Sequence, residues 1–165
     1  MLVKLMPDQV ARWWEVIQPA VEASLPPIAG SIKERRSKIL SSLLSGRMHC
    51  WAVCTKDKSG KETIVKGIGT TTFVLDECSG AKSLLIYSAF ANVKTEAEDW
   101  VDGFNTLTNF AKENKCDKIV AYTKNEKILH NAKQAGGDVW GYVIFPLDGN
   151  FEQKMFEGGE NENIH

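Results

Sequence analysis

The stretch from Lys82 to Cys116 most constrains the fold, because its pattern changes from that of a buried strand to that of an amphipathic helix. The first part is a nearly continuous apolar run, suited to a strand covered on both faces: Leu84, Leu85, Ile86, Tyr87, Ala89 and Phe90. The second part repeats apolar positions at the spacing of one helix face: Ala97, Trp100, Val101, Phe104, Leu107, Thr108 and Ala111. Thr95 and Glu98 fit the capping box that begins such a helix. A strand that ends at a helix N-terminus is a common place for a bound phosphate, so function is first sought at this junction.

Composition limits the classes of protein to which this chain can belong. Its 165 residues, of which 43% are hydrophobic, suffice for one globular domain with a core. The formal net charge of −1 provides no general attraction to nucleic acid or to an anionic membrane. No apolar run approaches the ~20 residues of a membrane helix, and the first residues lack the apolar segment of a signal peptide. We therefore expect a cytoplasmic protein with reduced cysteines and no membrane contact.

Periodicity and turn residues predict the other elements. A first helix opens at Pro7 and Asp8 and closes before Pro26, and a second runs from Ser31 to Gly46. The other predicted elements are strands at 48–55, 63–75 and 118–123, turns at 57–60 and 77–80, a short helix from Asn125 and a last strand at 139–147. We expect a single domain over 1–147 and a flexible acidic tail over 148–165, which is rich in Gly, Asn and Glu.

The order of these elements predicts an α+β fold. Three strands joined by turns form an antiparallel meander, and the long helix then makes a βαβ crossover that places the next strand parallel to the central one. The expected product is a mixed sheet flanked by helices.

This order, over residues 7–147, resembles the GNAT family of acyl-CoA-dependent N-acyltransferases. Near the C-terminal end, Asn125 and Gly136 fall on positions of a family pattern. Two functional positions of that pattern differ: the tyrosine that serves as general acid is replaced by Ala132, and a phenylalanine by Gly137. Alanine has no proton to donate.

The resemblance also implies where acetyl-CoA would bind if the protein is active. The implied cofactor-binding residues are Phe90, Ala91, Asn92, Val93, Lys94, Thr95 and Asn125. However, the family carries a glycine-rich signature in this loop, and residues 92–99 contain no glycine. Glu96, Glu98 and Asp99 also place negative charge there, and one carboxylate ~6 Å from a phosphate costs roughly 2–3 kcal/mol at an effective dielectric of ~20. These departures predict a degenerate site without a cofactor.

A finer resemblance concerns the packing motifs. The Trp-containing first helix, the segment 39–46 before Cys50-Trp51, and the segments 84–87, 100–103 and 116–123 are similar to small GNAT-like proteins encoded by bacteriophages, some in virion gene clusters. This similarity implies a location in the host cytoplasm or in the virion.

Two side chains are candidates to replace the missing general acid. Tyr122 lies at the C-terminal end of its predicted strand and His130 lies on the short helix, and they are the nearby groups that could serve. The alternative is a strand-end tyrosine and a surface histidine without a role. Cys50 and Cys54 lie on one strand face but roughly 13 Å apart by strand rise, so we predict buried thiols and no metal site.

Two function hypotheses follow. In the first, a degenerate GNAT-like protein acts through protein contacts made by the helices of residues 8–45 and by the tail 148–165. In the second, an active N-acetyltransferase moves the acetyl group of acetyl-CoA to an amine, with backbone amides of residues 90–93 polarising the carbonyl. A weaker third possibility is a bound acyl-CoA or nucleotide that does not react. Nucleic acid is not an expected partner, because the basic run at Lys33, Arg35, Arg36, Lys38 and Arg47 suits a solvated helix face.

Overall fold

The computed structural model describes residues 1–26, 32–56, 63–91, 93, 97–123 and 125–141. The chain divides into two compact units, Met1–Thr123 and Lys124–His165.

The first unit contains a five-stranded sheet with the strand order β1-β2-β3-β4-β5. Its elements are β1 (Leu2–Leu5), α1 (Pro7–Arg12), α2 (Trp14–Ala23), α3 (Ile32–Leu44), β2 (Met48–Lys56), β3 (Thr63–Leu75), β4 (Lys82–Ala91), α4 (Ala97–Glu113) and β5 (Lys118–Ala121). Neighbouring strands are antiparallel except for β4 and β5, which are parallel. The predicted α+β class, with its meander and βαβ crossover, is therefore confirmed.

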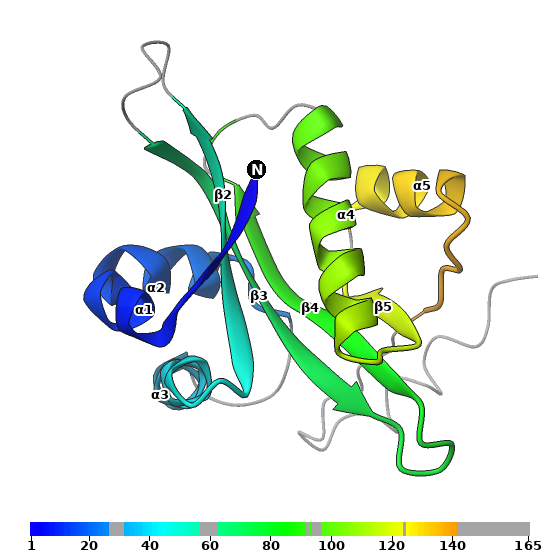
Figure 1. The fold of residues 1–165 in the computed structure, drawn as a ribbon, viewed down its shortest axis with the longest axis horizontal. Helices are drawn as coiled ribbons and strands as arrows, with labels where there is room; N and C mark the ends of the chain where they lie inside the picture. The colour runs from blue at the N-terminus through cyan, green and yellow to red at the C-terminus, as the bar shows by residue number, and fades with distance from the viewer. Residues whose placement is uncertain (27–31, 57–62, 92, 94–96, 124, 142–165) are drawn as a thin grey trace, which may run out of the picture. The chain divides into compact units, whose positions relative to one another are not determined.

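Helices cover the sheet on both faces (Figure 1). Helices α1, α2 and α3 lie on one face, where Val10, Ile17 and Val21 pack against Cys50 and other residues of the sheet. Helix α4 lies on the opposite face, where Leu107 and Ala111 pack against Trp51 and Leu84. Because strand side chains alternate between the two faces, a single sheet supports both cores.

Most element boundaries agree with their sequence signals. Strand β3 occupies the predicted 63–75, and α1 begins with Pro7 at a first-turn position where its missing N–H costs nothing. The turn before β4 also forms, with the Asp76 carboxylate accepting hydrogen bonds from the Cys78 amide and the Ser79 hydroxyl.

Four features differ from the sequence prediction, of which one is that β5 ends at Ala121 whereas the predicted strand reaches residue 123. Strand β1 was not expected, and the predicted first helix is divided at Trp13 into α1 and α2. Residues 139–141 are not in a strand, and the remainder of the predicted strand 139–147, the tail and the turn 57–60 lie outside the described residues.

The described part of the second unit consists of α5 (Glu126–Gln134) and the residues that end it. Asn125 begins the helix as predicted, its side-chain oxygen accepting a hydrogen bond from the Ile128 amide at 3.3 Å. At the other end, Gly136 has φ +82°, and the Gly136 and Gly137 amides donate to the carbonyls of Lys133 and Ala132. This Schellman motif gives both glycines a structural role.

Among the helices of the described residues, none is long and apolar enough to cross a membrane.

Candidate functional site at the fork between β4 and β5

The parallel pair β4–β5 opens into a fork. Its register runs from Ser83↔Lys118 to Ile86↔Ala121 and stops there, whereas β4 continues to Ala91. In the described part of the chain, the β5-facing edge of β4 beyond Ile86 therefore has no strand partner. An open edge presents backbone N–H and C=O groups that a ligand can bind.

A β-bulge lies at the point where the fork opens. In the β3–β4 register, Thr70 pairs with Ser88 but Thr71 pairs with Ile86, so Tyr87 is the extra residue. Bulges occur frequently beside active sites, because the local change of twist redirects the backbone. The Tyr87 side chain packs against the core under α1–α3, which leaves its backbone as the group available at the fork.

Small residues line the sheet beyond the bulge, on the face that α4 covers. Ala89 of β4 pairs with Gly69 of β3, which in turn pairs with Trp51 of the α4-side core. Ala91 pairs with Gly67, where an added Cβ would lie 2.5 Å from the Phe90 carbonyl oxygen. Few side-chain atoms therefore stand between solvent and the backbone here, as close approach of a ligand requires.

Two buried hydroxyls support the bulge from the other face. Thr70 and Ser88, 0% and 3% exposed, share a hydrogen bond of 2.7 Å between their side-chain oxygens. Because each hydroxyl satisfies the other, both are buried without an unpaired polar atom, and the bond links β3 to β4 immediately after the extra residue.

The predicted cofactor residues lie at the far end of this edge. Phe90 is half-buried and packs against the core under α1–α3, so its side chain is structural, whereas Ala91 and Val93 are exposed. Asn92, Lys94 and Thr95 lie outside the described residues, as does Glu96, so the phosphate arguments at this loop stay predictions. Glu98 is exposed in the first turn of α4.

The predicted catalytic side chains belong to different units. Tyr122 comes directly after Ala121, the last paired residue of β5, and is 50% exposed, so it lies at the fork. His130 is exposed on α5 of the second unit, as is the capping residue Asn125. The placement of His130 and Asn125 relative to the fork stays a prediction.

The cysteines and histidine of β2 contribute to the cores. Cys50 and Cys54 are buried, and burial raises the pKa of the Cys50 thiol to about 12. Within the described residues, no group of three His, Cys, Asp or Glu side chains is placed to hold a metal ion.

Solved structures of acetyltransferases have the same architecture. A ribosomal-protein-alanine N-acetyltransferase from Brucella melitensis biovar Abortus 2308 is 9% identical with a TM-score of 0.58, covering 89% of this chain and 99% of its own. An acetyltransferase from Trypanosoma brucei is 15% identical with a TM-score of 0.58, covering 88% and 97%. A predicted acetyltransferase from Clostridium acetobutylicum, solved with acetyl-CoA, is 13% identical with a TM-score of 0.59, covering 89% and 96%.

The chain has the GNAT fold. The resemblance in element order is thereby confirmed at the level of the fold. No protein-family model matches the sequence, and a search of curated proteins found no match. The similarity to bacteriophage proteins stays a prediction.

Within this GNAT fold, sequence reasoning missed the start of the candidate site. It placed the polarising amides at residues 90–93, whereas the open edge of β4 already begins at Tyr87 and includes Ser88 and Ala89. No local pattern marks Tyr87 as a bulge, because the bulge exists only in the pairing of β4 with β3. The small residues Gly67 and Gly69 were the available signal, since glycine inside a strand often marks a close approach.

Proposed function

We propose that this protein is an acyl-CoA-dependent N-acyltransferase that binds its acyl donor in the fork between β4 and β5. The observation that carries the proposal is the open edge of β4 beyond Ile86, which begins at the bulge residue Tyr87 and has a floor of small residues. The GNAT fold supports it.

The backbone of β4 has the central role. When bound, acyl-CoA supplies an activated thioester for attack by an amine. An extended chain with amide groups can lie along an open strand edge as an additional strand does, so the β4 backbone from Tyr87 to Ala91 orients it. A backbone N–H fixed beside a carbonyl oxygen stabilises the negative charge that develops on that oxygen during acyl transfer.

Tyr122 is the described side chain best placed to hold a proton at the fork. Its phenol is an O–H donor, and its position immediately beyond the last β4–β5 pair brings it next to the open edge. We assign it the role of general acid towards the departing thiolate, which Ala132 cannot perform. His130 stays the second candidate for this role.

The first prediction concerns acyl-CoA binding. Because Ala89 is exposed on the floor beside the fork, Ala89→Trp should weaken acetyl-CoA binding more than tenfold in isothermal titration at low salt. Ala11→Trp, an equal change at an exposed position of α1, should bind like the wild type. Absence of binding to the wild type at millimolar acetyl-CoA would exclude the enzyme.

The second prediction concerns Tyr122. Removal of a general acid typically lowers the rate by about 10²-fold or more, so Tyr122→Phe should lower kcat for thiol release from acetyl-CoA by about that factor. Its acetyl-CoA dissociation constant should stay within about twofold of the wild type. An unchanged kcat would transfer the role to His130, whose His130→Gln variant is measured in parallel.

A second candidate function is a GNAT-like protein that acts by contact. It is favoured by exposed apolar side chains on the helices of residues 8–45, with Trp13 at 45%, Val16 at 76% and Leu44 at 42% exposure. Its proposed contact surfaces are the helices of residues 8–45 and the tail 148–165, in a bacteriophage setting. Titrations with acetyl-CoA and with free CoA that both give no heat would favour this function over the enzyme.

A further inference from the structure

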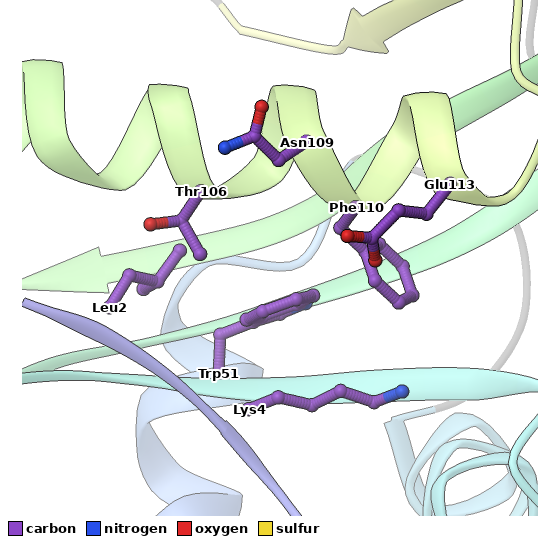
Figure 2. Close-up of a pocket in the computed structure, with 7 residues that line it drawn as sticks. All are labelled: Leu2, Lys4, Trp51, Thr106, Asn109, Phe110 and Glu113. Atoms are coloured by element: carbon purple, nitrogen blue, oxygen red, sulfur yellow. The ribbon is translucent and has the colours of Figure 1, made fainter.

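A second candidate site lies away from the fork, in a pocket of about 360 Å³ between β1, β2 and α4. Figure 2 shows Leu2 and Lys4 of β1 and Trp51 of β2 on one side, and Asn109, Phe110 and Glu113 of α4 on the other. This volume is at the small end of the range of ligand pockets, roughly 300–1,000 Å³.

The aromatic wall of the pocket is held in place before any ligand binds. Trp51 is 4% exposed, and its indole N–H donates a hydrogen bond of 2.9 Å to the Thr71 hydroxyl. Phe110 meets Trp51 edge to face, with ring centroids 5.0 Å apart, and stacks on Phe73 at 5.9 Å. Neighbouring side chains thus fix both rings already. The binding of an apolar ligand group therefore costs little conformational entropy in the Trp51 and Phe110 side chains.

Two opposite charges stand on either side of this wall. The Lys4 ammonium lies 4.7 Å from the centroid of the Phe110 ring, and Glu113 lines the pocket from α4. Neither side chain belongs to an ion pair found among the described residues. Because the pocket has one positive and one negative side chain, it favours a ligand that carries one group of each charge and no net charge.

We propose that this pocket binds a small zwitterion with an apolar body, of the class of a free amino acid with an aromatic or branched side chain. The carboxylate faces Lys4, the ammonium faces Glu113, and the side chain lies against Trp51, Phe110 and Leu2. The exposed Asn109 amide adds a hydrogen bond at the rim. This site is separate from the fork and does not rest on the acyltransferase proposal.

The test uses the full chain without acyl-CoA and three probes that differ by one group. L-phenylalanine has both charges, L-phenylalaninamide lacks the carboxylate, and 3-phenylpropionate lacks the amine. An exposed ion pair contributes up to about fivefold in affinity, so each truncated probe should bind roughly fivefold more weakly in ligand-observed NMR titration. No binding of L-phenylalanine at ten millimolar, or equal binding of all three probes, would overturn the proposal.

Variants then assign each charge. Lys4→Gln should remove the preference for L-phenylalanine over its amide but keep the preference over 3-phenylpropionate, and Glu113→Gln should do the reverse. Lys112→Gln, an exposed change on α4 outside the lining, should behave as the wild type. Loss of both preferences in either charge variant would overturn the assignment. The probe comparison on the wild type stands even if a variant proves unstable by circular dichroism.

Discussion

At the residue scale, His49 is a titratable group that folding places against aromatic rings. Its ring lies edge-on to Phe73 and Phe110, with centroids 5.3 and 5.0 Å away. Burial, and then the nearby Lys4 charge, lower its pKa from the ordinary value of 6.5. Its buried Nε2 has no hydrogen-bond partner among the described residues. A proton there would have to be placed among aromatic carbons and beside a positive charge.

The third prediction is that His49 makes stability depend on pH. Above the ordinary pKa of 6.5 the imidazole is neutral in both the folded and the unfolded states. As the pH falls below 6.5, the unfolded chain binds the proton first, so the free energy of unfolding decreases until the lower folded pKa is passed. Urea unfolding between pH 8 and pH 5.5 should show this loss, and His49→Gln should reduce it.

The control is His130→Gln, at an exposed position of α5, which should keep the pH dependence of the wild type. An equal slope of stability against pH in the wild type and in His49→Gln would contradict the role given to His49.

At the element scale, the apolar face of α4 is longer than the part of the helix that is buried in the core. Leu107 and Ala111 are 9% and 4% exposed, whereas Trp100, Val101 and Phe104, on the same predicted face, are each more than half exposed. The predicted helix face is confirmed, but only its second half is buried. The Thr95 end of the predicted capping box lies outside the described residues.

The fourth prediction compares two glycines in different elements. Gly67→Ala would place a Cβ 2.5 Å from the Phe90 carbonyl oxygen, so β3 and β4 must separate, at a cost of about 1–3 kcal/mol. Gly103 lies inside α4, and beyond its chain neighbours and its own helix backbone no atom of the described residues lies within 4 Å of an added Cβ. Gly103→Ala should therefore stabilise the protein by about 0.5–1 kcal/mol through helix propensity.

Both variants are measured by urea unfolding under the same conditions. The free energy of unfolding should decrease in Gly67→Ala and increase in Gly103→Ala. A Gly67→Ala variant as stable as the wild type would show that β3 and β4 are not in close contact at Gly67.

At the scale of the whole molecule, the first unit has two cores that share one sheet. Strand β4 contributes Leu84 to the core under α4, and Tyr87 and Phe90 to the core under α1–α3. Because both cores pack on the same sheet, unfolding of the sheet exposes both of them. The two cores should therefore unfold together.

The fifth prediction tests this coupling. Ile17→Ala on one face and Leu84→Ala on the other remove side chains that are 2% and 0% exposed. Each should lower the free energy of unfolding by about 2–5 kcal/mol. In both variants, near-ultraviolet and far-ultraviolet circular dichroism should report one common transition of the first unit. Two separated transitions in either variant would mean that the faces unfold independently.

The sequence by itself determined the order and type of most elements and, through them, the α+β class. Hydrophobic period, caps and turn residues act between near neighbours, so β3, β4 and α4 were recognisable from their own residues. Strand β1 was missed because four residues before a helix carry too little periodicity, and it exists through pairing with β2.

Only the tertiary structure decided the candidate site. The extra residue at Tyr87 and the end of the β4–β5 register at Ile86 are properties of strand pairs, which no single segment encodes. The pocket beside Phe110 likewise needs β1, β2 and α4 together. Local interactions select helix or strand within a few residues, whereas a fork, a bulge and a pocket arise from contacts between segments distant in sequence.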